Sequence, residues 1–216
     1  MPDEIGIQDA KKMLLYIADK IIARKELLTE VDSAIGDGDH GIGMAGGMQK
    51  VKEKLSKQEE FESVYQVFEI AGKAMLMSMG GASGVIFGSL YMAGAKGRGV
   101  SEKINAEELT QMLRRSLEAI KERGKAKQGD KTMIDALEPA VIAMEPNYSK
   151  GLPKMLKEAE DAAKQGVEDT KKYAAKFGRA KSLMERSIGH QDAGATSVWL
   201  IIQGMKEYIA GGDRHA

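Results

Sequence analysis

Apolar residues recur every three to four positions along most of the chain, which is the period of an amphipathic α-helix. The first segment shows this stripe through Ile7, Ala10, Met13, Leu14, Ile17 and Ile21. With further segments of the same kind, the predicted helices cover residues 7–21, 44–55, 61–75, 85–95, 105–124, 133–144, 153–167 and 196–205. Because neither an alternating run of β-branched residues nor an Asn-Gly hairpin turn is present, the pattern predicts an all-α fold with about eight helices.

Residues with special backbone preferences stand where these helices are expected to begin, bend or end. Asn105 and Glu108 have the spacing of a capping box, and Gly124 stands where the same helix is expected to end. Pro153 suits the first turn of the seventh helix. Pro139 falls inside the sixth, which it is expected to bend.

The overall composition is that of an ordinary folded protein. The chain has 216 residues, 43% of them apolar and 30% charged, and residues 1–216 are expected to form a single domain. Its 32 basic and 32 acidic residues cancel, so no net positive field attracts nucleic acid or a membrane surface. The absence of cysteine excludes disulfides, thiol catalysis and cysteine-ligated metals. The chain starts with acidic residues where a secretory signal would be basic, so a cytoplasmic location is expected.

One uncharged stretch, residues 74–95, has the length of a membrane span. It holds five glycines and three serines, however, and the sequence GGASG lies near its centre. Two buried helices that meet at a glycine-rich turn explain this composition better than one lipid-exposed helix. No membrane span is therefore predicted.

The most informative connecting segment covers residues 32–41 and reads DSAIGDGDHG. It holds the carboxylates of Asp32, Asp37 and Asp39, and the glycines between them permit tight turns that point these side chains the same way. Oxygen ligands of this kind suit Mg²⁺ or Ca²⁺. An EF-hand is excluded because Gly41 and Met48 stand at ligand positions of the calcium loop. The alternative is a solvated Asp-Gly turn that caps the following helix.

Glycine patterns in the same segment formally match nucleotide-binding loops. Gly36-x-Gly38-x-x-Gly41 and Gly41-x-Gly43-x-x-Gly46 fit the dinucleotide fingerprint, but neither follows a predicted strand, so a Rossmann site is not predicted. A P-loop is excluded because the chain lacks Gly-x4-Gly-Lys-Ser/Thr. Three aspartates repel a phosphate unless cations lie between them. The carboxylates and the glycine-rich helix start together indicate a site for a metal–phosphate complex.

Four motifs together resemble a known family. They are IGDGDHG at 35–41, GGASG at 80–84, RGKAKQGDKTM at 123–133 and GRAKSLMERSIGHQDAGATS at 178–197. In order and spacing they are similar to the nucleotide-binding L subunits of dihydroxyacetone kinases, and the resemblance extends over the whole chain. It implies that the helices form a closed antiparallel barrel with ADP and two Mg²⁺ at one rim.

The resemblance also implies roles for particular residues. By motif position, the metal ligands are Asp32, Asp37 and Asp39. The residues expected to line the nucleotide are His40, Gly41, Ile42, Gly43, Ala82 and Ser83 at the phosphates, and Gly124, Met133, Arg179, Asp192, Ala193 and Gly194 around the nucleoside and in the closing loop. Three positions depart from the usual family residues, since Gly43 replaces an asparagine, Met48 a phenylalanine and Ala193 a proline.

The implied function is that of a kinase subunit that carries ADP as a bound coenzyme. His40 is typical of the phosphoenolpyruvate-dependent members, in which an M-type phosphotransferase-system subunit converts the bound ADP transiently to ATP. The γ-phosphoryl then passes to dihydroxyacetone on a separate K subunit. The chain is thus expected to act as part of a phosphoenolpyruvate–glycerone phosphotransferase, only with its partners and without a covalent nucleophile. The alternatives are an ATP-exchanging ketose or acyl kinase domain and a non-catalytic nucleotide-sensing module of the same fold.

Overall fold

Nine α-helices build most of residues 3–211, the part of the chain that the computed structural model describes. They are α1 (Ile7–Ala23), α2 (Lys25–Ser33), α3 (His40–Lys57), α4 (Val64–Ser78), α5 (Gly81–Met92), α6 (Ala106–Gly124), α7 (Ile134–Met144), α8 (Leu152–Thr170) and α9 (Ala193–Ile209). Two 3₁₀ segments, η1 (Tyr148–Lys150) and η2 (Arg179–Ser187), and two short strands, β1 (Glu4–Gly6) and β2 (Lys103–Asn105), complete the described elements. The predicted all-α fold is confirmed.

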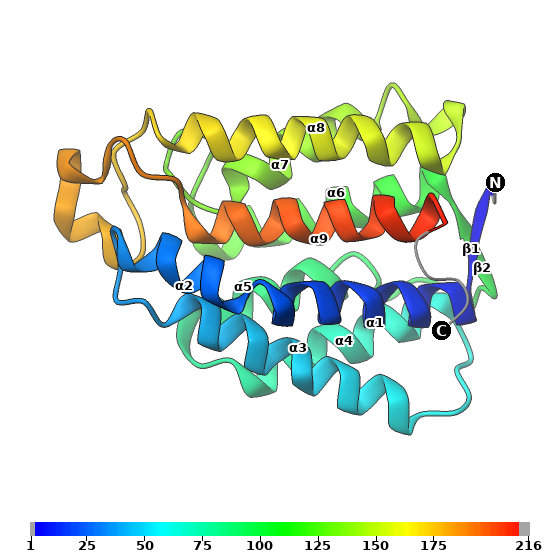
Figure 1. The fold of residues 1–216 in the computed structure, drawn as a ribbon. Helices are drawn as coiled ribbons and strands as arrows, with labels where there is room; N and C mark the ends of the chain where they lie inside the picture. The colour runs from blue at the N-terminus through cyan, green and yellow to red at the C-terminus, as the bar shows by residue number, and fades with distance from the viewer. Residues whose placement is uncertain (1–2, 212–216) are drawn as a thin grey trace.

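Eight of these helices form a closed ring within the described residues. In the order α1, α3, α4, α5, α6, α7, α8 and α9, each helix packs against the next, and α9 packs against α1. Figure 1 shows that α1 and α3 run in opposite directions, as do α8 and α9. α2 joins the ring at one end, where it contacts α1, α3 and α9. This arrangement agrees with the closed helical barrel that the resemblance implies.

The apolar faces of the helices meet inside the ring. Ile17, Phe68, Leu117, Leu156 and Ile201 come from five different helices, and all are almost completely buried. Removing such surface from water is the main favourable contribution to folding. The same burial explains why the 3.6-residue pattern of the sequence predicted these helices well.

Two glycines bring helices close together at one end of the ring. A Cβ atom at Gly41, in the first turn of α3, would overlap the backbone of α2 at Lys25 and the side chain of Thr29. A Cβ atom at Gly84, in the first turn of α5, would overlap the carbonyl of Met79. A larger residue at Gly41 would therefore push α3 away from α2 and displace the loop between them.

Several local predictions are confirmed. Asn105 Oδ1 accepts from the Glu108 N–H at 2.9 Å, and Glu108 Oε2 accepts from the Asn105 N–H at 2.9 Å, which completes the capping box of α6. Pro153 lies in the first turn of α8 as predicted. Pro139 lies inside α7, and the bend expected there stays a prediction. α6 ends at Gly124 as predicted, although the following residue, Lys125, adopts the left-handed conformation with φ 57°.

The structure differs from the predicted elements in three places. α2 is absent from the prediction because only Leu28 is buried among its nine residues, so the apolar stripe is too short to detect. β1 and β2 pair Ile5 with Ile104, and three-residue strands leave no alternating run in the sequence. Residues 179–187, predicted as part of a loop, form η2.

The uncharged stretch 74–95 comprises the end of α4 and the whole of α5, with a break at Met79 and Gly80. The prediction of two helices that meet at a glycine-rich turn is confirmed. Among the helices of residues 3–211, none combines the length and the hydropathy that a bilayer crossing requires.

Candidate functional site

One end of the ring carries a cavity of about 870 Å³, which lies within the size range of small-molecule sites. Figure 1 shows α2, the start of α9 and η2 gathered at this end, and β1 and β2 at the other. The predicted site residues that line the cavity are Asp32, Asp37, Asp39, His40, Ile42, Gly43, Ala82, Ser83, Met133, Arg179, Asp192, Ala193 and Gly194. Segments that are up to 162 positions apart in the sequence, from 32 to 194, therefore meet in one place.

Two predicted site residues, Gly41 and Gly124, lie behind the wall of the cavity. Gly41 faces α2, as described above. Gly124 stands behind Ile86, because a Cβ atom at Gly124 would lie 3.6 Å from Ile86 Cδ1, and Ile86 is part of the lining. Gly41 thus shapes the wall through its close approach to α2, whereas Gly124 makes only an ordinary contact with Ile86.

An acidic triplet, Asp32, Asp37 and Asp39, lies on one side of the cavity. One carboxylate oxygen from each residue lies within 4.8 Å of those of the other two. Asp39 is the N-cap residue of α3, yet its side chain accepts no capping hydrogen bond. Asp32 Oδ2 accepts from the His40 N–H at 3.2 Å instead. The predicted alternative, in which this turn only caps the helix, therefore leaves the carboxylate of Asp39 unexplained.

The charges of the triplet are only partly balanced. Loss of hydration, followed by repulsion from Asp37 and Asp32, raises the pKa of Asp39 above its ordinary value. Arg179 from η2 opposes this shift, and its Nε donates to Asp37 Oδ2 at 2.8 Å. One guanidinium against three carboxylates leaves an excess of negative charge, which is the condition that divalent cations satisfy best.

Two helix N-termini open on the same cavity. α3 begins at His40 and α5 at Gly81, and neither has a side-chain N-cap hydrogen bond from the residue before it. Ile42 in the first turn of α3, and Ala82 and Ser83 in the first turn of α5, line the cavity. The N–H groups of a first turn have no intrahelical partner and carry partial positive charge. The cavity thus offers carboxylates to cations and N–H donors to an anion.

The imidazole of His40 connects α3 to α9. Its Nε2 lies 2.8 Å from Ser197 Oγ, the ring bonds to the backbone of Ala193, and it packs 5.8 Å from the ring of Phe87. Burial lowers the pKa of His40, and neighbouring Asp32 only partly opposes this effect. The imidazole is therefore neutral near pH 7 and holds the start of α3 against the start of α9.

Asp192 caps α9 from inside the cavity wall. Its Oδ2 accepts from the Ala195 N–H at 2.7 Å. Burial raises the pKa of Asp192 to about 7, and the negative charge of Asp135 adds to the effect. Behind this turn, a Cβ atom at Gly194 would lie 3.4 Å from Met133 Cβ, so the closing loop packs directly on the segment that carries Met133.

Lys131 is a lining residue that the sequence analysis missed. It is 2% exposed, has a left-handed φ of 60°, and donates from Nζ to the carbonyls of Thr170, at 2.6 Å, and His190. Burial lowers its pKa, while Asp192 and Asp135 oppose the shift. Lys131 thus ties the end of α8 to the loop before α9. Its place inside a motif, GDKTM, was the available signal.

Comparison with known proteins decides the family. The model of the DAK2 domain matches residues 34–207. The chain belongs to the DAK2 domain family. This DAK2 domain is 39% identical over 196 residues to "PEP-dependent dihydroxyacetone kinase 1, ADP-binding subunit DhaL" of Listeria innocua, covering 91% of this chain and 93% of that protein. It is 38% identical over 192 residues to the "PEP-dependent dihydroxyacetone kinase, ADP-binding subunit DhaL" of Escherichia coli K12, covering 88% and 91%.

A solved structure shares the fold. The DAK2 domain superposes on the crystal structure of the dihydroxyacetone kinase from C. freundii in complex with AMP-PNP and Mg²⁺, with a TM-score of 0.73 and 25% identity. The match covers 92% of this chain and 33% of that longer one. The family resemblance drawn from the motifs is therefore confirmed, and the ring of helices corresponds to about a third of the larger kinase.

Proposed function

We propose that this DAK2 domain is the ADP-carrying subunit of a cytoplasmic, phosphoenolpyruvate-dependent dihydroxyacetone kinase. The observation that carries the proposal is the joint position, on one cavity, of the acidic triplet and two helix N-termini whose preceding residues provide no side-chain cap. The two relatives described above, which match it over nearly their whole length, are named ADP-binding subunits of such kinases. In this proposal residues 1–216 act as one nucleotide-binding domain.

The donor set fits a magnesium–diphosphate complex. Asp32, Asp37 and Asp39 would hold two Mg²⁺, and the first-turn N–H groups of α3 and α5 would hold the phosphates. Bound Mg²⁺ supplies charge neutralisation at the phosphate oxygens. On the apolar part of the lining, Met133 and Ile86 leave room for a nucleoside.

The domain would contribute positioning and charge rather than a covalent nucleophile. Phosphoryl transfer depends mainly on alignment and on stabilising negative charge. The guanidinium of Arg179, 77% exposed at the mouth of the cavity, is free to turn toward a phosphate once cations take over Asp37. His40 and Lys131 would act indirectly, because they hold the first turn of α3 and the loop before α9 in place.

The phosphoryl donor and acceptor would reach the cavity from outside. We propose an M-type phosphotransferase subunit as donor and a K subunit carrying dihydroxyacetone as acceptor. Large apolar side chains stand exposed on the elements that border the mouth, namely Ile42, Met77, Val85 and Met184. Exposed apolar groups of this kind are typical of surfaces that dock another protein.

The test is mass spectrometry of the protein as purified, followed by one matched pair of variants. We expect ADP to co-purify with the parent protein and to be lost from Asp37→Asn. Asp161→Asn, which removes an exposed carboxylate on α8 that pairs with Lys157, should retain ADP. Retention of ADP by Asp37→Asn, or no nucleotide binding at saturating Mg²⁺, would contradict the proposal.

An ATP-exchanging ketose kinase domain is the second candidate. The observation in its favour is the shared fold with a dihydroxyacetone kinase crystallised with AMP-PNP and Mg²⁺. Phosphorylation of dihydroxyacetone by free ATP, with a K-type partner but without phosphoenolpyruvate or a phosphotransferase chain, would favour it over the first. Tight binding to a regulator without turnover in either mixture would indicate a sensing module instead.

A further inference from the structure

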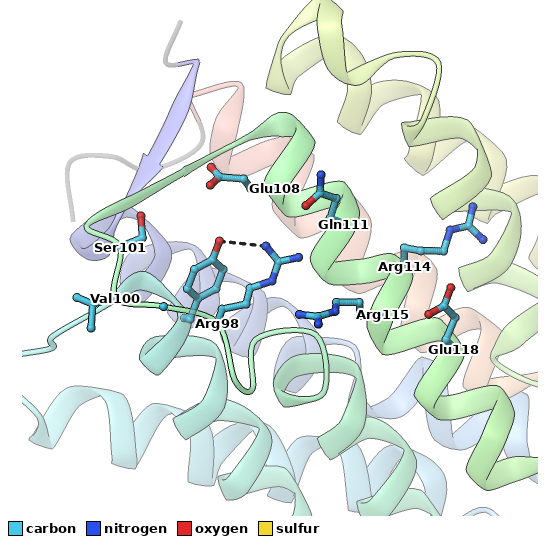
Figure 2. Close-up of a pocket in the computed structure, with 10 residues that line it drawn as sticks. Arg98, Val100, Ser101, Glu108, Gln111, Arg114, Arg115 and Glu118 are labelled. Carbon is cyan, nitrogen blue, oxygen red and sulfur yellow. Dashed lines mark hydrogen bonds between the residues drawn. The ribbon is translucent and has the colours of Figure 1, made fainter.

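A second cavity, of about 700 Å³, lies between the first half of α6, the start of α4 and the loop that follows α5. Figure 2 shows its walls, with Arg98 and Ser101 on the loop and Gln111 and Arg115 on α6. α5 begins at the first cavity and ends before this loop, so the two cavities lie at opposite ends of a helix about 18 Å long. The second cavity is thus separate from the nucleotide site.

The guanidinium of Arg98 is held in place without any carboxylate. Its Nε donates to the carbonyl of Gly94 at 3.0 Å and its Nη1 to Tyr65 Oη at 3.3 Å, and it stacks 5.2 Å from the centre of the Tyr65 ring. The loop itself is fixed, because the Ser101 N–H donates to Ser63 Oγ at 3.1 Å, next to the start of α4. A preorganised guanidinium loses little conformational entropy when it binds a further partner.

Arg115 supplies a second positive charge from the opposite wall. In Figure 2 its side chain extends from α6 toward Arg98. Within residues 3–211 it makes no hydrogen bond or ion pair. The adjacent Arg114 differs, since it points away in Figure 2 and pairs with Glu145. Two guanidinium groups therefore face one cavity, and neither forms an ion pair within residues 3–211.

The two carboxylates that line the cavity form no ion pair with Arg98 or Arg115 among the described residues. Glu108 is engaged in the capping box, where it accepts from the Asn105 N–H. Glu118 lies nearly one turn beyond Arg115 on α6 and makes no ion pair with either guanidinium in the described structure. Both guanidinium groups are therefore available to an anionic ligand.

We propose that Arg98 and Arg115 bind the phosphate group of a small phosphorylated molecule. A guanidinium recognises an oxyanion through two parallel N–H bonds, so two of them match a dianion rather than a single carboxylate. The Tyr65 hydroxyl accepts from Arg98, and its own proton is available to a phosphate oxygen. The cavity of about 700 Å³ leaves room for a small group attached to the phosphate.

The test is an NMR titration of the intact protein with inorganic phosphate and with glycerol phosphate, at constant ionic strength in chloride. We expect saturable shifts of the Val100 and Ser101 amides and of the Arg98 side-chain Nε–H. Arg115→Gln should weaken binding at least about tenfold, the effect of losing one charge-assisted bidentate contact. Arg114→Gln is the matched control on the same helix and should change the affinity less than about twofold.

Two results would overturn this inference. The first is a response at these amides that grows linearly with phosphate or is unchanged in Arg115→Gln, while circular dichroism shows that the variant is folded. The second is tighter binding of a dicarboxylate such as succinate, which would remove the assignment to phosphate. The outcome does not depend on the proposed kinase function, because the resonances report on this cavity alone.

Discussion

In the ion pair between Arg179 and Asp37, the guanidinium occupies a carboxylate that we propose as a metal ligand. We therefore expect Arg179 to compete with a divalent cation for Asp37. Arg179 Nε lies 2.8 Å from Asp37 Oδ2, on a carboxylate that a metal ion would also need. We expect Arg179→Ala to bind Mg²⁺ more tightly than the parent in the absence of nucleotide, because the cation no longer has to displace the guanidinium. With nucleotide present we expect the opposite, namely that Arg179→Ala binds Mg²⁺ more weakly than the parent, since the released guanidinium of the parent then helps to hold phosphate.

The magnitude follows from the exposure of the pair. Two unit charges at 2.8 Å attract by about 1.5 kcal/mol in water. The side chains of Arg179 and Asp37 are 77% and 40% exposed, so ordering and screening reduce the net value to roughly 0.2–1 kcal/mol. Arg179→Ala should therefore raise Mg²⁺ affinity by at most about fivefold, and less at high salt.

The assay is a titration of nucleotide-free protein with Mn²⁺ in place of Mg²⁺, followed by electron paramagnetic resonance. Arg186→Ala serves as the control, because Arg186 lies on the same 3₁₀ segment and forms no ion pair in residues 3–211. Equal or weaker Mn²⁺ binding by Arg179→Ala than by the control would refute the reasoning, since Asp37 would then not be shared between guanidinium and metal.

Further predictions concern stability, each measured by urea unfolding. Burial raises the pKa of Asp192 to about 7, so its protonated form favours folding and stability falls as pH rises from about 4 to 7. Asp192→Asn should therefore gain more stability relative to the parent at about pH 8 than at about pH 5, and an equal difference at both pH values would contradict this. Gly166→Ala should lower the free energy of unfolding by several kcal/mol, because its Cβ would overlap a carbonyl of α7. Gly46→Ala, which has nothing within 4 Å of the added Cβ, should raise the free energy of unfolding by about 0.5–1 kcal/mol. Similar values for both variants would be inconsistent with the close approach of α7 and α8. Glu160→Ala should lower the free energy of unfolding by about 2–4 kcal/mol, because the buried carboxylate accepts a hydrogen bond from Trp199 Nε1 at 2.7 Å. Glu160→Gln should lower it less. The reverse order would show that this hydrogen bond does not account for the loss of stability.

Helices with a long apolar stripe could be predicted from the sequence because their burial depends mainly on spacing. The stripe of α1 places its buried side chains on one face, and that face packs inside the ring. α2 could not be found in this way, since Leu28 is its only fully buried residue. The strands β1 and β2 are stabilised by backbone pairing between distant segments, with Ile5 opposite Ile104, 99 positions away, which no local pattern reveals.

The acidic part of the candidate site was accessible because its residues are neighbours in the sequence. Asp37 and Asp39 are two positions apart, and Asp32 lies just before them, at the end of α2. The motif could mark Lys131 but could not give its role, because that role depends on carbonyls 39 and 59 positions away, at the end of α8 and in the loop before α9. Arg98 and Arg115 were not predicted either, because they come to line one cavity only in the folded chain.

The contact that closes the ring, between α1 and α9, has a consequence for protein architecture. Tyr208 in the last turn of α9 donates to Asp9 Oδ1, in the first turn of α1, at 3.4 Å. Both groups lie at the β1–β2 end, about 25 Å along α9 from the mouth of the first cavity. Tethers attached at either end, or a linker that joins α9 to α1 in a circular permutant, would leave the mouth of the first cavity unobstructed. A domain with this geometry can be joined to further polypeptide at the β1–β2 end without changes to the end that carries the first cavity.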